Sequence, residues 1–259
     1  MPPTEWGWPP SADELVGLQF RLAEAAALAA ADDGWQPSGA PLVVGGCYVV
    51  HPRGTAGPGR QGDRAWAAAV AWRQDGRRDG RRDGSPRRAG DVLARVVVTG
   101  RAPAPYVPGL LASRDGPVLV AALEGLPVRP DVVLVDASGL DHPRGAGLAV
   151  HLGAATGLAT VGITRRPLVA TGDQPELRRG TTTPLWLGGR CVAFWVCTRT
   201  GARPLVAHAG WRTSPDTAVR LALETSTPAA RTPVPLQEAR RAAREARSLW
   251  GAALDAGLA

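Results

Sequence analysis

Lysine and asparagine are both absent from this sequence, so all thirty of its basic residues are arginines. No uninterrupted apolar stretch reaches 18 residues, so no segment is expected to span a membrane. The N-terminus has no basic region followed by an apolar one, which argues against a secretory signal. The three cysteines, Cys47, Cys191 and Cys197, lack the spacing of a metal-binding motif. They are expected to be reduced, buried thiols in a cytoplasmic protein.

Composition favours a folded protein with a polyanionic partner. The length of 259 residues and the apolar fraction of 44% suit a packed domain. The formal charge of +7 and the isoelectric point near 10.7 make nucleic acid the first candidate partner. The exclusive use of arginine is also typical of a GC-rich genome, so the number of arginines carries little weight by itself.

Hydrophobic periodicity and turn signals predict alternating strands and helices. Three strands, a helix, a strand, a helix and a further strand indicate an α/β fold, an RNase H-like mixed β-sheet flanked by helices in a single domain. The expected strands are 41–50, 64–72, 92–98, 132–135, 158–163, 190–198 and 204–208, and the expected helices are 11–25, 110–126, one from 143, one from 214 and 237–250.

The domain is expected to cover residues 11–250, between a loose N-terminal tail at 1–10 and a C-terminal tail at 251–259. Residues 73–91 include a short tandem repeat, Gly76–Gly84, that has no apolar residue. This composition predicts a disordered, charged loop. The loop is either a solvated insertion without function or a non-specific contact to phosphates.

The most informative stretch is 130–153. An unbroken apolar run ends on Asp136, a small-residue turn follows, and Pro143 is predicted to open a helix. Chemistry in α/β proteins is commonly placed at the carboxyl ends of strands. Asp136 is therefore either a functional acid or a structural residue that caps the following loop.

Four segments together resemble the endonuclease V family, over roughly residues 12–245. They are Pro105–Asp115, Pro130–Gly153, Val161–Arg165 and Ala209–Asp216. The resemblance implies a nuclease that nicks DNA or RNA near inosine, and hence a role in nucleic-acid repair or processing. It implies Mg²⁺, or alternatively Mn²⁺, held by carboxylates that project from strand and helix ends. A monomer is expected.

The resemblance also assigns roles to individual residues. Asp136 and Asp115 match metal-binding acids, although Asp115 stands where the family has Glu, and Arg165 replaces a catalytic Lys. The loop Pro105, Tyr106, Val107 and Pro108 resembles a wedge that parts the strands. Ala137, Ser138 and Gly139, followed by His142 and Arg144, match the loop that receives the turned-out base.

Two departures from the family pattern bear on catalysis. Tyr48 stands at the metal-binding Asp of the first strand, and Trp211 is assigned to the position of an assisting His. A phenol with a pKa of about 10 is a poor Mg²⁺ ligand, and an indole cannot accept a proton. His51 and His208 lie three residues away from these positions, which places them on the opposite strand faces. The chain is therefore an impaired nuclease or an inactive descendant that binds nucleic acid or a protein; a sequence under little constraint is a third possibility.

Overall fold

The structure, a computed structural model, describes residues 5–32, 34–36, 41–53, 57–74 and 90–255. No helix in these ranges is both long and apolar enough to cross a membrane. In chain order the elements are α1 (Ala12–Asp32), β1 (Val43–Val50), β2 (Arg64–Gln74), β3 (Gly90–Arg101), α2 (Leu111–Glu124), β4 (Val132–Val135), α3 (Leu148–Thr156), β5 (Ala159–Thr164), β6 (Thr182–Leu187), β7 (Arg190–Val196), β8 (Leu205–Ala209), α4 (Pro215–Glu224) and α5 (Val234–Asp255).

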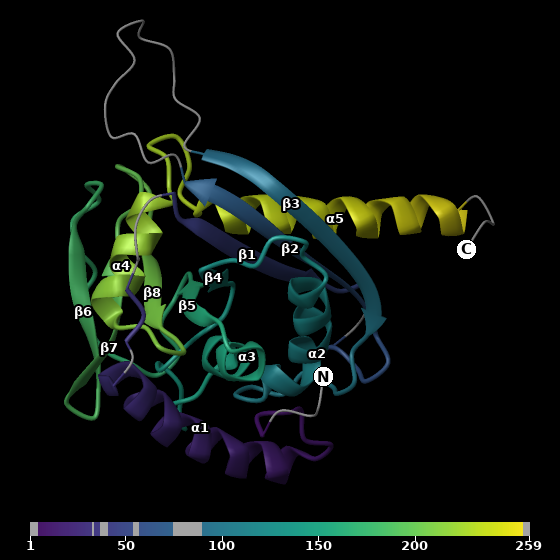
Figure 1. The fold of residues 1–259 in the computed structure, drawn as a ribbon, viewed down its shortest axis with the longest axis horizontal. Coiled ribbons are helices and arrows are strands. Elements are labelled where there is room, and N and C mark those ends of the chain that lie inside the picture. Colours follow the sequence, from purple (N-terminus) through teal and green to yellow (C-terminus); the bar gives the residue numbers. More distant parts are fainter. Residues whose placement is uncertain (1–4, 33, 37–40, 54–56, 75–89, 256–259) are drawn as a thin grey trace, which may run out of the picture.

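Within these ranges, eight strands form one mixed sheet in the order β3-β2-β1-β4-β5-β8-β7-β6 (Figure 1). β4 lies parallel to both β1 and β5, and the other neighbours are antiparallel. The parallel centre brings the carboxyl ends of β1, β4 and β5 to one edge of the sheet. Asp136 and Tyr48 lie at this edge.

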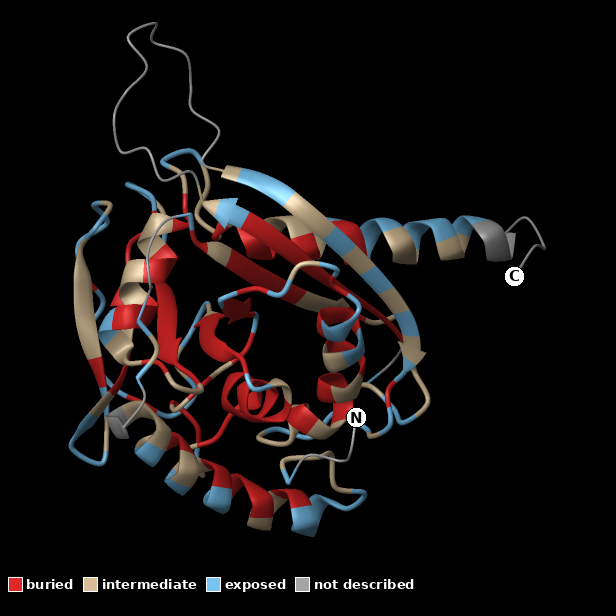
Figure 2. Ribbon diagram, viewed as in Figure 1, coloured by how far each residue is buried: buried red, intermediate tan, exposed pale blue. Residues whose placement is uncertain are grey.

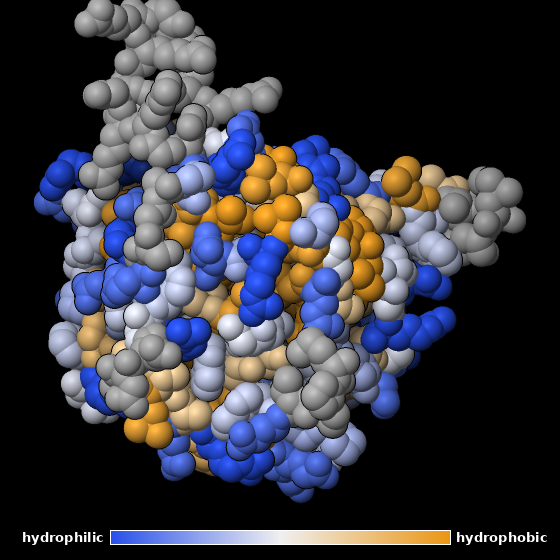
Figure 3. Space-filling model, viewed as in Figure 1, coloured by the Kyte–Doolittle hydropathy of each residue, from blue (hydrophilic) through white to orange (hydrophobic). Residues whose placement is uncertain are grey.

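Helices cover both faces of the sheet, as the burial of all four residues of β4 requires. Val132 and Leu134 pack with α4 and α5, whereas Val133 and Val135 pack with α2 and α3. α1 lies outside α3 as a further layer (Figure 1). Figure 2 shows the buried residues concentrated in the central strands and in α3, while the end of α5 extends past the sheet with exposed and half-exposed residues. On the face seen in Figure 3, apolar residues gather near the edge strand β3.

The expected mixed sheet is confirmed, with three corrections to the elements. The helix predicted from Pro143 begins only at Leu148. Gly145 has a left-handed φ of 70°, which is incompatible with a right-handed helix at that residue. β6 was not predicted, since Pro184 disfavours a strand, but β6 is an edge strand and edges tolerate proline. α5 begins at Val234 rather than residue 237.

Parts of both predicted tails belong to the fold, and most of the predicted insertion lies outside the described residues. Trp8, in the expected loose tail at 1–10, stacks on His151 with ring centroids 4.1 Å apart, and Trp6 lies against Trp211. α5 continues to Asp255, inside the expected tail at 251–259. Most of the repeat-bearing insertion at 73–91, including Gly76–Gly84, lies outside the described residues.

Candidate nucleic-acid site

Asp136 follows the carboxyl end of β4 and lies beside Tyr48 of β1. The parallel register pairs Cys47 with Val135, and one further step along both strands brings Tyr48 next to Asp136. The Tyr48 phenol borders the same small cavity as Asp136 and acts to lower the pKa of that carboxyl. Burial, followed by the charge of Asp136, raises the pKa of Tyr48, so the phenol is neutral at physiological pH. The two aligned positions therefore do meet, with a phenol in place of an acid.

Arg165 and Arg240 complete the surroundings of Asp136. Together with Tyr48 and residues of β5 and α5 they line a cavity of about 20 Å³, enough for about one water molecule. Desolvation raises the pKa of Asp136, and the charges of Arg165 and then Arg240 oppose this effect. Because Asp136 is exposed, solvent limits the effect of desolvation on its pKa. Asp136 thus shares a small cavity with two arginines and a phenol.

Trp211 does not belong to this site, which corrects its assignment. β8 is antiparallel to β5, so Ala209 pairs with Val161, near the amino end of β5. The Trp211 amide then donates to Thr160 Oγ1 at 2.9 Å, whereas Asp136 lies at the carboxyl edge. The residue of the late helices that reaches Asp136 is Arg240, on α5.

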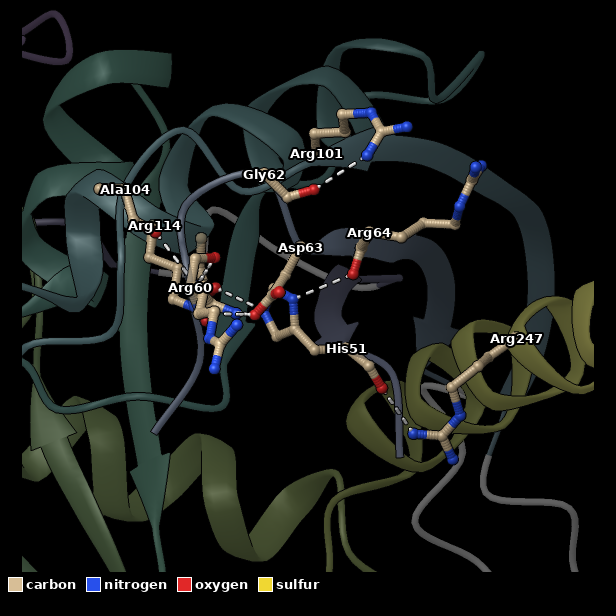
Figure 4. Close-up of polar contacts among 10 residues, drawn as sticks. His51, Arg60, Gly62, Asp63, Arg64, Arg101, Ala104, Arg114 and Arg247 are labelled. Atoms are coloured by element: carbon tan, nitrogen blue, oxygen red, sulfur yellow. Dashed lines mark hydrogen bonds and ion pairs between the residues drawn. The ribbon is translucent and has the colours of Figure 1, made fainter. Parts of the chain in front are cut away.

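Asp115, from the first turns of α2, is paired with His51, which follows β1. His51 Nε2 lies 2.9 Å from Asp115 Oδ1, and Nδ1 lies 3.2 Å from the Arg64 carbonyl oxygen. Both ring nitrogens of His51 thus face oxygen acceptors, and one oxygen of Asp115 is engaged by this ring. Figure 4 shows His51 between Arg64 and Arg247, whose guanidinium donates to the His51 carbonyl at 3.0 Å.

The predicted wedge is exposed and rests on a buried arginine. Tyr106 and Val107 are each 40% exposed. Arg114 is only 3% exposed and donates to the carbonyl oxygens of Arg60 and Ala104 and to the carboxylate of Asp63, at 2.8–3.1 Å (Figure 4). Arg114 therefore ties the start of the wedge loop to the turn before β2.

The other end of the wedge loop is joined to the loop after Asp136. The Gly109 carbonyl accepts from Gln19 Nε2 at 3.0 Å, His142 Nε2 at 3.1 Å and an Arg144 guanidinium nitrogen at 2.8 Å. Burial lowers the pKa of His142 to about 4, so its ring is neutral, with the proton on Nε2. Both His142 and Arg144 thus bind the protein itself at this carbonyl and position the end of the wedge loop.

The candidate base pocket, residues 137–139, is fixed by close backbone packing. A Cβ at Gly139 would lie 1.9 Å from the Ala209 carbonyl oxygen, which only glycine avoids. Ala137 is buried, and the Ser138 carbonyl accepts from the Ala149 amide at 3.1 Å. The loop is thereby held between β8 and the start of α3.

Two acid–base residues near the site are fully buried, and two arginines of the site were not predicted from the sequence. Asp141 is fully buried and accepts hydrogen bonds from the backbone amides of residues 168–170. His208 is also fully buried, and burial lowers its pKa to about 4. Arg114 and Arg240 were missed: Arg114 is one of thirty arginines, and α5 is rich in them.

The donor set around Asp136 does not fit Mg²⁺. This ion requires six oxygen ligands in near-ideal octahedral geometry, commonly with carboxylates among them. Asp136 has a neutral phenol and two guanidinium groups as neighbours, and Asp115 is already paired with His51. Across the part of the chain that the structure describes, no three His, Cys, Asp or Glu side chains form a group that could hold a metal. Repulsion by Arg165 and Arg240 adds to this poor coordination.

The mixed sheet, with helices on both faces and an acid at the end of β4, defines an RNase H-like protein. A family model for endonuclease V matches residues 87–241, and the chain belongs to this family. Endonuclease V of Streptomyces coelicolor is 47% identical over 121 residues, covering 47% of this chain and 52% of that protein. The chain spans about half the length of the curated relatives it matches.

Solved structures extend the likeness to nearly the whole chain. The crystal structure of endonuclease V from Streptomyces avermitilis has a TM-score of 0.77 and 30% identity, covering 95% of this chain and 96% of that one. An endonuclease V from Ciona intestinalis, in complex with DNA containing an inosine followed by a ribo-adenosine, has a TM-score of 0.69 and 17% identity, covering 91% and 97%. The latter likeness concerns the fold alone.

Proposed function

We propose that this protein binds inosine-containing DNA or RNA through the endonuclease V wedge and base pocket, and does so without Mg²⁺-dependent cleavage. The observation that carries the proposal is the pair of residues on either side of Asp136. Tyr48 places a neutral phenol beside this carboxyl, and Arg240 supplies a positive charge where a metal would need an anionic ligand.

The exposure and the anchoring of the wedge loop support binding of nucleic acid. Tyr106 is exposed, and both ends of its loop are anchored, by Arg114 on one side and through Gly109 on the other. A fixed apolar wedge can enter a base stack at lower entropic cost than a mobile one. The Ciona protein was solved in complex with DNA containing an inosine, and such DNA serves as the test ligand.

The residues around Asp136 lack the donor set that a metal ion for phosphodiester cleavage requires. A metal ion supplies both the activated water and neutralisation of the phosphate. Arg165 and Arg240 can neutralise a phosphate, but neither can deprotonate water at neutral pH, because guanidinium keeps its proton. The site therefore suits binding of a phosphate better than its hydrolysis.

The test measures binding and nicking on the same oligonucleotides. Matched strands containing inosine or adenosine are titrated with the protein, then incubated in Mg²⁺ or Mn²⁺. We expect tighter binding of the inosine strand and no metal-dependent nicking. Nicking that disappears in Asp136→Ala would overturn the non-catalytic assignment. Equal affinity for the two strands would overturn inosine recognition.

A revertant identifies the residues responsible. Tyr48→Asp combined with Arg240→His restores an acid and a metal-binding imidazole beside Asp136. We expect this double variant to bind Mn²⁺ more tightly than the natural protein, measured by calorimetry. Tyr48→Asp combined with Trp211→His is the matched control, because Trp211 lies at the other end of β5, and it should gain less.

A further inference from the structure

A second, much larger hollow lies between α5 and the edge of the sheet where β1 ends and β2 begins. We call it the α5 groove; its volume is about 1150 Å³. Six arginines line it, Arg53, Arg64, Arg240, Arg241, Arg244 and Arg247, against one acid, Glu245. Such an excess of one charge in a concave surface concentrates its field on a ligand of the opposite sign.

The groove continues directly from the site at Asp136. Arg240 lines both the small cavity beside Asp136 and the α5 groove. Arg247, also in the groove, donates to the carbonyl of His51, which is the partner of Asp115. The groove therefore adjoins the surroundings of both acids, through Arg240 at Asp136 and through Arg247 and His51 at Asp115.

The arginines of the α5 groove differ in how far carboxylates of the protein already pair with them. Arg241 is paired with Glu238 and Glu245, which reduces its use for a ligand. Among the described residues, no carboxylate forms an ion pair with Arg53, Arg64 or Arg244. Arg53 and Arg244 are also exposed. These charges are thus open to phosphate groups.

One arginine is held flat against an aromatic ring. The Arg64 guanidinium carbon lies 3.6 Å from the centroid of the Trp250 ring, in cation–π contact. Figure 4 shows the Arg64 side chain directed away from His51, so it takes no part in the pairing of Asp115. Nucleic-acid bases stack on aromatic rings and on guanidinium planes alike. The Arg64–Trp250 pair therefore offers a base platform between open phosphate-binding charges.

We propose that the α5 groove binds a single-stranded segment of the nucleic acid that flanks the inosine site. The proposal rests on the proposed function for the identity of the ligand. From Arg240 to Gly251 the helix rises about 16 Å, at 1.5 Å per residue. This length can follow several nucleotides of a strand, within the site sizes of single-strand-binding folds. The end of α5, which extends beyond the sheet in Figure 1, serves as one wall of this channel.

The experiment uses the full chain and two fluorescent single strands, each with one central inosine. The short strand has three nucleotides on either side, and the long strand has ten. Affinity is measured by anisotropy at several salt concentrations for the natural protein, for Arg53→Gln with Arg244→Gln, and for Trp250→Ala. Arg178→Gln with Arg190→Gln is the charge-matched control, because both residues belong to the β6–β7 side of the sheet and lie outside the groove.

For the long strand we expect the groove double variant to lower the slope of log affinity against log salt by about 1.4, at about 0.7 per lost contact. Trp250→Ala should weaken the long-strand complex by at least about fivefold, since base stacking is lost. The short strand should change much less with either variant. Equal losses in the control double variant, or an unchanged slope in the groove variant, would overturn the proposal.

The result also separates this proposal from the proposed function. If inosine and adenosine strands bind equally while the groove variant still loses slope, inosine recognition fails and the groove stands. If inosine preference persists with an unchanged slope, the groove assignment fails alone. Loss of slope only with duplex DNA would reject single-stranded binding. Binding of an acidic polypeptide such as polyglutamate that falls with the groove variant while the oligonucleotide slope stays unchanged would reject nucleic acid as the ligand.

Discussion

Replacing Arg114 by methionine should destabilise the fold more than any change of an exposed arginine. Arg114 is 3% exposed, and its fork supplies the Arg60 and Ala104 carbonyl oxygens with hydrogen bonds at 2.8 and 3.1 Å. Methionine fills much of the same volume but donates nothing. Two partly buried carbonyl acceptors then lose their donor, at about 1–3 kcal/mol each. Asp63 is partly open to water, which can replace its lost partner. We therefore expect a loss of about 3 kcal/mol.

The matched control is Arg101→Met, because Arg101 donates to the carbonyl of Gly62 in the same turn but is exposed (Figure 4). Exposed substitutions of this kind change stability by no more than about 0.5 kcal/mol. Urea unfolding of the two variants, with unchanged slopes in urea, gives the difference directly. A loss below about 1 kcal/mol for Arg114→Met, or equal losses in both variants, would refute the view that Arg114 anchors the wedge loop.

Three other substitutions probe the site loops. Gly139→Ala should weaken oligonucleotide binding and lower stability by about 2 kcal/mol or more, because the added Cβ would lie 1.9 Å from the Ala209 carbonyl oxygen. The control is Gly251→Ala, where the added Cβ meets open space, and it should cause no measurable change in thermal unfolding. Asp141→Ala should cost about 3 kcal/mol in urea, because three backbone amides at 168–170 lose their acceptor. Because the folded pKa of His142 is about 4, below its ordinary value, the unfolded chain takes up a proton first as pH falls, so stability drops between pH 7 and 4.5. His142→Gln should remove about 2 kcal/mol of that drop, and an unchanged pH profile would contradict the assignment.

The central sheet could be predicted because each strand has a local signal. Residues 132–135 form an apolar run that ends on an acid, and the structure places β4 there without change. The hairpin of β7 and β8 and the helix capped by Ser214 were likewise legible from alternation and a capping residue. Such signals depend on neighbours in the chain, which the sequence supplies.

The site was less predictable, because its contacts join residues far apart in the chain. Tyr48 could be aligned to a family position, yet its place beside Asp136 depends on strand register. The pairing of His51 with Asp115 joins residues 64 positions apart. Trp211 was assigned from a motif, whereas the antiparallel direction of β8 decides where that motif lies.

The substitutions around Asp136 are best understood as a set. Asp136 is flanked by a positive charge and by a neutral phenol. Arg240 and Tyr48 supply these groups, in the part of the site where a metal would otherwise neutralise the acid. Restoring an acid at residue 48 alone would place two carboxylates side by side, with Arg240 as a remaining counter-charge that also repels Mg²⁺. The gain in Mn²⁺ affinity of the double variant, Tyr48→Asp with Arg240→His, should therefore exceed the sum of the gains of the two single variants. A double-mutant cycle on Mn²⁺ binding measures this coupling, and strictly additive effects would show that the two residues act independently.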